Sequence, residues 1–291
     1  AIGVILRRMA FLLLPLSILF IKYYPALGRT YHTTGGLIYA GVTGNKNALG
    51  ALCMICGIYF TWNMLLYRWK TSSSEQQLQS SVYLIMLPSI GWLMYIANSA
   101  TSFTCLMFAI CLFVVGRQRA FSQNPLNIVI FGIVCIIAYG MLEIAFDVKD
   151  SLIAMLGRRP DLTTRVPMWN DLLTMAGNPL VGYGFESFWL GERRDIMRTN
   201  WGIEGQAHNG YLDMYLNLGY AGLFFALAYI LSGLKTTYHC LFIEYPIALF
   251  RMSIILVFLL YNWTENAFHL MSVLWFLLIF SIMDSPTQKK S

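Results

Sequence analysis

Long apolar runs recur along the chain, separated by short polar turns and by one long polar loop. Most of these runs approach the roughly 20 apolar residues that are needed to cross a bilayer core. We expect eight membrane helices, at residues 9–24, 47–66, 82–97, 103–116, 126–145, 211–232, 247–263 and 268–283. The pattern therefore predicts an all-α, polytopic membrane helix bundle.

Composition and charge agree with this class. The chain is 57% hydrophobic and 12% charged, whereas a soluble domain is about 25% charged. A net charge of +6 would suit a nucleic-acid-binding protein, but the positions of the charges argue against one. With eight spans, most basic residues outside the long loop fall on one side, which the positive-inside rule assigns to the cytoplasm. These residues are Arg7, Arg8, Arg68, Lys70, Arg117, Arg119, Lys235, Arg251, Lys289 and Lys290.

Residues 1–291 are expected to form a single integral-membrane domain. The chain starts with Ala and enters almost directly into a helix, so we expect it to be the C-terminal part of a longer protein. The predicted topology places the long loop, residues 146–209, outside the cytoplasm. Its seven basic residues do not count against this topology, because long loops are largely exempt from the positive-inside rule.

The first outward loop, residues 24–47, carries two basic side chains, Arg29 and Lys46, on its outer face. Asn45 or Asn47 is expected to cap the second helix and leave backbone N–H groups pointing outward. Two interpretations stay open. The loop forms one wall of an anion site, or it is a polar hinge whose charges rest at headgroup level.

The long loop holds two further candidate elements. In GRRPDLTTRVPMWNDLL (157–173), Asp161, Thr163 or Thr164 is expected to cap a short helix that carries Trp169, Leu172 and Leu173 on its apolar face. That helix is too short to cross a membrane and would lie along its surface. The glycine-rich, aromatic stretch GNPLVGYGFESFW (177–189), which includes Tyr183, suits a snug outer lining or a platform for sugar rings.

His208 is the first candidate for catalysis. It opens an apolar helix, together with Asn209, directly after the long loop. Imidazole exchanges a proton near neutral pH, and ionisable residues in membrane segments usually have a function. Asn209 and Asp213 are expected to orient the ring. The alternative is that the histidine only caps the helix or sits at headgroup level.

An arginine cluster precedes this histidine in the same loop. Guanidinium groups bind phosphate oxygens bidentately, so the cluster fits the pyrophosphate of a lipid-linked donor. Alternatively, salt bridges to Asp150, Asp161 and Asp171 hold a charged loop. The sequence has no DxD-like pair and no HExxH motif, so we expect a metal-independent mechanism without a cofactor, in which arginines stabilise the developing charge. The cluster consists of Arg158, Arg159 and Arg165.

The last outward turn, NWTENAFH (262–269), brings Glu265 and His269 to the expected outer surface. An interfacial position explains His269 better than a catalytic role does.

Three segments together resemble the O-antigen ligase/polymerase superfamily: LTTRVPMW (162–169), NPLVGYGFESFW (178–189) and AHNGYLDMYLNLGYAGL (207–223). LPLSILFIKYYPALGRTY (14–31) and GVTGNKNALG (41–50) are similar to its exopolysaccharide-polymerase branch. The resemblance covers essentially the whole chain.

The resemblance implies a GT-C-like, multi-pass glycosyltransferase of the bacterial inner membrane, with its active site facing the periplasm. Its donor would be an undecaprenyl-pyrophosphate-linked glycan and its acceptor a glycan hydroxyl, with a chain-length regulator protein as a further partner. His208 would then be the base. Arg165 would contact the pyrophosphate, joined by Arg29.

Three functions stay open at this point. The first is a polymerase of glycan repeat units, and the second is a ligase that moves finished glycan onto lipid A core or protein. The third, a permease for an anionic solute, is disfavoured. Transporters usually place charges at the membrane midplane, often in repeated halves, and this chain has no internal repeat.

Overall fold

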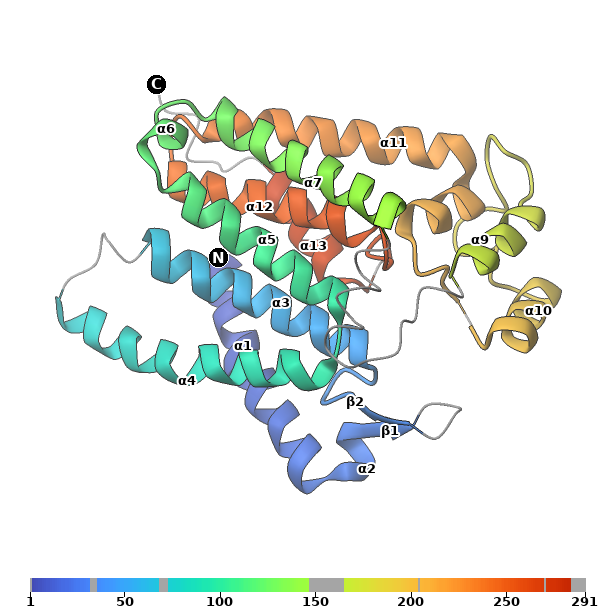
Figure 1. Ribbon diagram of the computed structural model, residues 1–291, viewed down its shortest axis with the longest axis horizontal. Coiled ribbons are helices and arrows are strands. Elements are labelled where there is room, and N and C mark those ends of the chain that lie inside the picture. Colours follow the sequence, from blue (N-terminus) through green and yellow to red (C-terminus); the bar gives the residue numbers. More distant parts are fainter. Residues whose placement is uncertain are drawn as a thin grey trace. The chain divides into compact units, whose positions relative to one another are not determined.

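The computed structural model describes residues 2–31, 36–67, 73–146, 165–203, 205–269 and 271–283. Almost all regular structure in these ranges is helical (Figure 1). The helices are α1 (Ile2–Tyr23), α2 (Pro25–Gly28), α3 (Lys46–Trp62), α4 (Ser73–Ala97), α5 (Ala100–Gly116), α6 (Arg119–Ser122), α7 (Leu126–Phe146), α9 (Arg165–Thr174), α10 (Glu192–Trp201), α11 (Gly210–Cys240), α12 (Tyr245–Tyr261) and α13 (Val273–Ile282). A short hairpin, which the hydrophobic pattern did not predict, pairs β1 (Arg29–Tyr31) with β2 (Leu37–Tyr39) in antiparallel register.

The prediction of a mostly helical membrane protein is confirmed. Three helical segments are long and apolar enough to cross a membrane: Ile2–Tyr23, Lys46–Leu66 and Gly210–Cys240. The second consists of α3 and most of the π-helical turn that continues it, Asn63–Tyr67. Five shorter apolar helices coincide with the other expected segments, so every expected membrane helix corresponds to an observed one. That all eight cross the bilayer stays a prediction. The largest shifts are in α4, which begins already at Ser73, in α11, which runs on to Cys240, and in α1, which begins at Ile2.

The chain divides into two compact units. The first comprises residues 1–128 and 241–253, and the second comprises residues 129–240 and 254–291.

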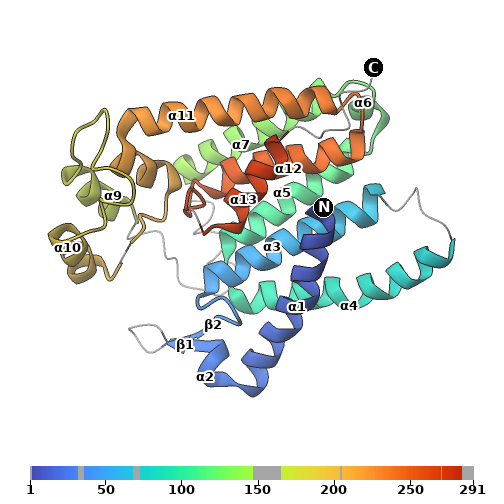
Figure 2. The ribbon, with the colours of Figure 1, turned by 180° about the vertical axis from the view of Figure 1, so that it is seen from behind.

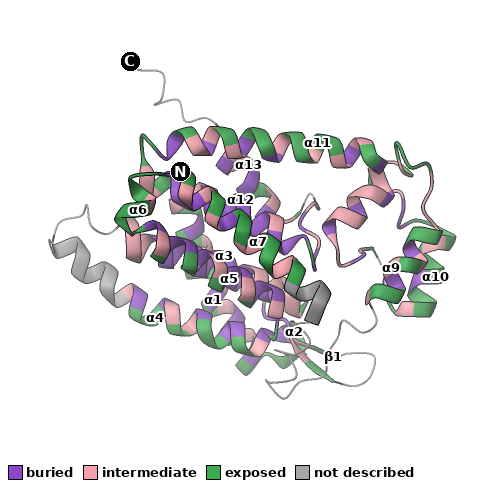
Figure 3. Ribbon diagram, turned by 45° about the horizontal axis from the view of Figure 1, so that its top comes forward, coloured by how far each residue is buried: buried purple, intermediate pink, exposed green. Residues whose placement is uncertain are grey.

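Helix α3 is the centre of the first unit and packs against α4 and α5. Most of its residues from Leu49 to Trp62 are buried (Figure 3). Two glycines allow α5 to approach closely: a Cβ on Gly50 would lie 2.5 Å from the Ser99 Cβ, and one on Gly57 would lie 2.8 Å from a methyl carbon of Leu106. Small residues at helix contacts let backbones approach in this way in membrane proteins.

Helix α11, in the second unit, is broken at Gly219, whose φ of 61° and ψ of −158° are not helical. The break releases backbone groups that a helix would pair internally. Backbone atoms of residues 179–184 pair with them instead. Tyr220 N donates to the Pro179 carbonyl at 2.8 Å, and Gly184 N donates to the Asn217 carbonyl at 2.7 Å.

Glycine is required at both sides of this backbone contact. A Cβ on Gly182 would lie 2.5 Å from the Asn217 carbonyl, and one on Gly219 would lie 2.4 Å from the Leu180 carbonyl carbon. Both residues also have positive φ, where side chains are strained. The backbone of the glycine-rich stretch is therefore fixed against the first half of α11, and its expected part as an outer lining or a platform for sugar rings stays a prediction.

Helices α9 and α10 lie next to each other beyond the N-terminal end of α11 (Figure 2). They share a small apolar core with the loop that joins them and with the start of α11. The core residues are Met168, Leu172, Phe188, Trp189, Met197, Ala207 and Leu216. The predicted short helix is present as α9, with Met168 and Leu172 as its buried side chains. Of the other two side chains expected on its apolar face, Trp169 is half-buried and Leu173 is exposed, so the prediction for Leu173 was wrong. Its expected capping residues, Asp161, Thr163 and Thr164, lie outside the described residues.

Candidate active site

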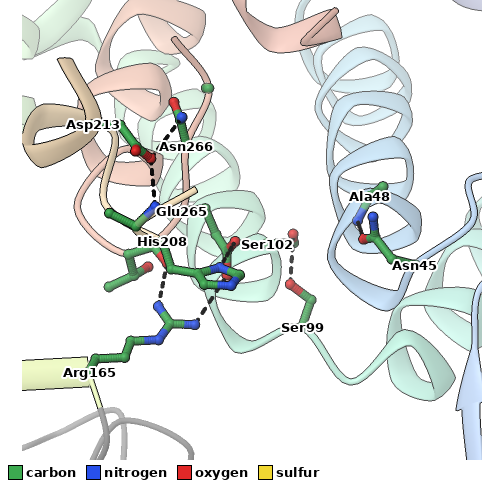
Figure 4. Close-up of polar contacts among 12 residues, drawn as sticks. Asn45, Ala48, Ser99, Ser102, Arg165, His208, Asp213, Glu265 and Asn266 are labelled. Carbon is green, nitrogen blue, oxygen red and sulfur yellow. Dashed lines mark hydrogen bonds and ion pairs between the residues drawn. The ribbon is translucent and has the colours of Figure 1, made fainter. Parts of the chain in front are cut away.

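A buried carboxylate joins the two residues that the sequence singled out for catalysis. Glu265 Oε1 lies 3.4 Å from Arg165 Nη2, and Glu265 Oε2 lies 3.2 Å from His208 Nδ1. Figure 4 shows both side chains directed toward this carboxylate. The Glu265 side chain is 6% exposed, Arg165 is 12% exposed and His208 is 23% exposed. The three groups form one polar cluster, with the imidazole its most accessible member.

The turn after α12 fixes the position of Glu265. Asn262 braces this turn, because its side-chain amide donates to the Phe258 carbonyl and accepts from Ala267 N, both at 2.8 Å. Gly210 N donates to the carbonyls of Asn262 and Glu265 at 2.9 Å. A Cβ on Gly210 would lie 2.0 Å from Asn262 Oδ1, so this glycine lets the turn pack against the first residue of α11.

Arg165 is the first residue of α9 and reaches the same turn twice. Besides its pairing with Glu265, its Nη1 donates to the Thr264 carbonyl. A guanidinium carries five N–H donors in a planar fork. These two contacts orient the group and leave further N–H donors for a ligand.

His208 has a φ of +50°, a left-handed conformation that costs a non-glycine residue on the order of 1–3 kcal/mol. The residue before it is held from two sides. Trp169 Nε1 donates to the Ala207 carbonyl at 2.8 Å, and Ala207 N donates to Asp213 Oδ2 at 2.8 Å. Such strain persists where the surroundings impose it, and it is concentrated at functional sites.

Asp213 supports the site through the backbone. Its carboxylate is buried and accepts from Trp189 Nε1 at 2.9 Å and from Asn266 Nδ2 at 3.0 Å, in addition to Ala207 N. It therefore connects the residue before His208 with the residue after Glu265 (Figure 4). We expected Asp213 to orient the imidazole ring itself, but the ring is bonded to Glu265.

Asn209 caps α11. Its Oδ1 accepts from Leu212 N at 3.0 Å, which satisfies one of the unpaired N–H groups at the helix start. Its predicted contribution to substrate binding stays a prediction.

The cluster has the electrostatics of a base with an orienting partner. When His208 donates from Nδ1 to the carboxylate, the lone pair of the neutral ring is on Nε2, which is then the atom that accepts a proton. The carboxylate fixes this tautomer and stabilises the imidazolium that forms, as the aspartate does in a Ser-His-Asp triad. Arg165 balances the buried negative charge.

Two other predicted residues, Trp169 and Tyr183, have structural contacts within the second unit. Trp169 uses its indole N–H on the Ala207 carbonyl, as described above. Tyr183 donates its hydroxyl to the Met175 carbonyl at 3.1 Å, and the Arg193 guanidinium lies 3.9 Å from its ring centre. Their predicted contacts with substrate are compatible with these positions but are not tested by them.

Arg158 and Arg159 lie outside the described residues, as do Asp150 and Asp161. For Arg165, the partner that the structure shows is Glu265, which was not among the acids of the alternative of a salt bridge within the loop. Asp171, the remaining acid of that alternative, accepts from Trp201 Nε1 at 2.9 Å.

Arg29 and Lys46 belong to the first unit. Arg29 Nε donates to the Ile21 carbonyl at 2.9 Å, and its guanidinium lies 5.7 Å from the Tyr39 ring centre. Lys46 is the first residue of α3 and follows Asn45, whose Oδ1 accepts from Ala48 N at 2.8 Å. Of the two asparagines considered, Asn45 is therefore the cap.

The described ranges contain no group of three or more His, Cys, Asp or Glu side chains placed to hold a metal ion. The principal residue that sequence reasoning missed is Glu265, which was expected at the outer surface without a role.

Comparison with known proteins identifies the family of the chain. The family model described as O-antigen ligase matches residues 81–227, a region that contains Arg165 and His208 but ends before Glu265. No curated protein matches the chain. A match over half the chain, to a family of glycosyltransferase-like membrane ligases and polymerases, identifies this multi-pass membrane protein as a member of the O-antigen ligase family.

Proposed function

We propose that this protein transfers a glycan from an undecaprenyl-pyrophosphate carrier to a hydroxyl of an acceptor glycan, on the periplasmic side of the bacterial inner membrane. The observation that carries the proposal is the single carboxylate, Glu265, that contacts both His208 and Arg165. A proton acceptor and an anion-binding group in one cluster are what a glycosyl transfer with a pyrophosphate leaving group requires.

His208 acts as the general base. Its Nε2 takes the proton of the acceptor hydroxyl as that oxygen bonds to the anomeric carbon of the donor, and the bond from this carbon to the pyrophosphate oxygen breaks. Glu265 stabilises the imidazolium that forms. General-base catalysis of this kind contributes about 10²–10⁴-fold to the rate.

Arg165 stabilises the departing pyrophosphate. Its free N–H donors bind phosphate oxygens, and no metal ion is needed for this role because a guanidinium is permanently charged. Arg158, Arg159, Arg29 and Lys46 are further candidates for binding the pyrophosphate. Trp169, Tyr183 and Asn209 are candidates for positioning the glycan.

Two reactions differ in their acceptor. The first that we propose is polymerisation of exopolysaccharide repeat units. The ligase reaction, which moves finished glycan onto lipid A core or protein, is the second, and the matching family is described as O-antigen ligase. The chain-length profile of surface polysaccharide after gene deletion separates the two. Loss of a polymerase leaves single repeat units on the surface, whereas loss of a ligase leaves finished glycan on its lipid carrier.

The test is transfer by the purified protein in lipid nanodiscs, supplied with lipid-linked repeat units. His208→Ala and His208→Asn are expected to lower the transfer rate by about 10²–10⁴-fold. Asparagine tolerates positive φ, so the second variant keeps the backbone and removes only the base. His239→Asn is the matched control, since His239 is an exposed histidine in the last turn of α11. Full polymer from a normally inserted His208→Ala protein, or solute uptake without transfer, would refute the proposal.

A further inference from the structure

The second unit also contains a cavity that the proposed reaction does not use. A cavity of about 200 Å³ opens beside the first half of α11. Its lining includes Phe185 and Glu186 from the glycine-rich loop and His269 from the turn after α12. Neither His208 nor Arg165 is among the described residues that line it.

The cavity runs from an exposed rim to a buried floor. The Glu186 and His269 side chains at the rim are 54% and 52% exposed, and Phe185 is 57% exposed. On the floor, Trp189 and Asp213 are buried. A small molecule can therefore enter from the rim and reach the floor.

Hydrogen bonds link the floor to the chain neighbours of the catalytic residues. Asp213 and Asn266 both line the cavity, and the Asp213 carboxylate accepts from Asn266 and from Ala207 N, as described above. These bonds connect the floor to the residues next to His208 and Glu265 in the chain. A ligand seated here would be within one layer of side chains of the reacting groups.

The two polar groups at the rim face each other at ion-pair distance, and they form an ion pair when the imidazole is protonated. Glu186 Oε1 lies 3.7 Å from His269 Nε2, which is too far for a direct hydrogen bond. His269 Nδ1 accepts from Met271 N at 3.1 Å, so the proton of the neutral ring is on Nε2 and faces Glu186. A hydroxyl both donates and accepts, and one hydroxyl can therefore satisfy both rim groups.

Glu186 has a φ of +51°. A carboxylate residue in this conformation is strained by on the order of 1–3 kcal/mol. The described residues include only two other non-glycine positions with positive φ, Asn98 and the candidate base His208. The strain supports a functional position for Glu186 at this rim.

The side chains that line the cavity indicate which class of ligand it binds. Two carboxylates, Glu186 and Asp213, disfavour an anion such as a phosphate, and the polar rim and floor disfavour a lipid chain. Three aromatic side chains, from Phe185, Trp189 and Phe268, offer apolar surface for the C–H face of a ring. The volume is below the roughly 300–1,000 Å³ of pockets for drug-sized ligands, so it has room for one ring.

We propose that this cavity is a saccharide subsite that takes one neutral sugar ring of the glycan, with Glu186 and His269 bound to its hydroxyls and Phe185 packed against its face. That the bound ring belongs to the glycan substrate rests on the proposed function. The donor and the acceptor are both glycans, and the experiment separates these two sources.

The first experiment measures binding without transfer. Methyl glycosides of glucose, galactose, mannose and N-acetylglucosamine are titrated against the purified protein in nanodiscs, with saturation-transfer difference NMR as the readout. At least one glycoside is expected to bind at millimolar concentration. Phe185→Ala and Glu186→Gln are each expected to weaken it by roughly three- to tenfold, and Phe185→Tyr should retain it.

The controls are chosen within the same unit. Glu192→Gln makes the same chemical change at an exposed position on α10, and Phe224→Ala removes an exposed ring from α11. Both should bind the glycoside as the parent does. Absence of binding by all four glycosides, or binding that is unaffected by both rim variants, would overturn the inference.

The second experiment uses the transfer assay. A rise in KM for the lipid-linked donor in Phe185→Ala assigns the subsite to the donor, and a rise in KM for the acceptor assigns it to the acceptor. His208→Ala is expected to bind the glycoside normally while losing transfer. If the parent protein binds glycosides in this cavity but transfers no glycan, the proposed function fails and the subsite stands. If it transfers glycan but no glycoside binds, the subsite inference alone fails.

Discussion

Two helix starts in this protein have the same cap and different surroundings. Asn45 precedes α3 and accepts from Ala48 N at 2.8 Å, and Asn209 precedes α11 and accepts from Leu212 N at 3.0 Å. The α3 cap stands beside Lys46 and glycines. The α11 cap follows His208 at positive φ and is followed by the buried carboxylate of Asp213.

The asparagine caps do not distinguish the two helix starts, since both make the same contact, but the partners of the neighbouring side chains do. At α11, the turn after α12 supplies a carboxylate that orients the imidazole and an arginine from α9 binds the same carboxylate. The chemistry depends on packing between segments that are far apart in sequence.

After His208, Arg165 is the residue whose replacement should have the largest effect on the α11 side of this comparison. Arg165→Lys keeps the positive charge but cannot donate to Thr264, Glu265 and a phosphate with the same planar fork. We expect transfer to fall by about 10²–10³-fold, as when one donor to a developing anion is removed. Arg198→Lys, on α10, makes the same substitution outside the cluster and should transfer at nearly the parent rate. Equal rates for the two variants would remove Arg165 from the mechanism.

Glu265 is expected to act by positioning. Glu265→Gln leaves one acceptor oxygen where two partners are now bound, so we expect kcat to fall by roughly 10–100-fold, equivalent to about 1–3 kcal/mol for a mismatched buried group. The KM for the acceptor should change little, and Glu265→Asp should recover part of the rate. A Glu265→Gln protein with parent kcat would show that the bridge between Arg165 and His208 is structural only.

Replacing each asparagine cap tests directly whether the two helix starts differ in their effect on transfer. Asn45→Ala and Asn209→Ala should each lose about 1 kcal/mol of stability, because each leaves a helix N–H group unpaired. Thermal unfolding in nanodiscs measures this loss. Only Asn209→Ala should also lower transfer, by several-fold, since it loosens the residue next to His208. A similar loss of transfer in both variants would mean that the α3 start belongs to the site as well.

Replacing Lys46 should have the smallest effect on glycan transfer. If it helps to bind the donor pyrophosphate, as proposed, Lys46→Ala will raise the KM for the donor by a few-fold, in keeping with the ~1 kcal/mol or less of an exposed charge pair. Steady-state kinetics at low and high salt check this, because the difference should shrink as salt screens the interaction. An unchanged KM at low salt would leave Lys46 as part of a polar hinge.

The sequence predicted the helical elements well, because apolar runs of membrane length constrain the chain strongly. It also identified His208 and Arg165 as candidates from their residue types and their position in one loop. It did not reveal the break in α11, since Gly219 lies inside an apolar run that reads as continuous helix. The backbone of residues 179–184 satisfies that break, and pairing between distant segments is not visible in a local pattern.

Glu265 could not be assigned for a related reason. In NWTENAFH it is a single carboxylate in a short turn, and nothing local distinguishes an exposed acid from a buried one. Its role depends on Asn262, which folds the turn, and on Gly210, which gives it room against α11. Three segments must be placed together before the carboxylate meets its partners.

The central claim is that His208 and Glu265 act as one unit, and a double-mutant cycle on the rate of glycan transfer tests it most directly. Transfer is measured at saturating donor and acceptor for His208→Asn, Glu265→Gln and the double variant, all inserted normally. Residues that act together have non-additive effects, so the double variant should be no slower than His208→Asn alone. Losses that multiply in the double variant, or a His208→Asn protein that transfers at the parent rate, would contradict the account.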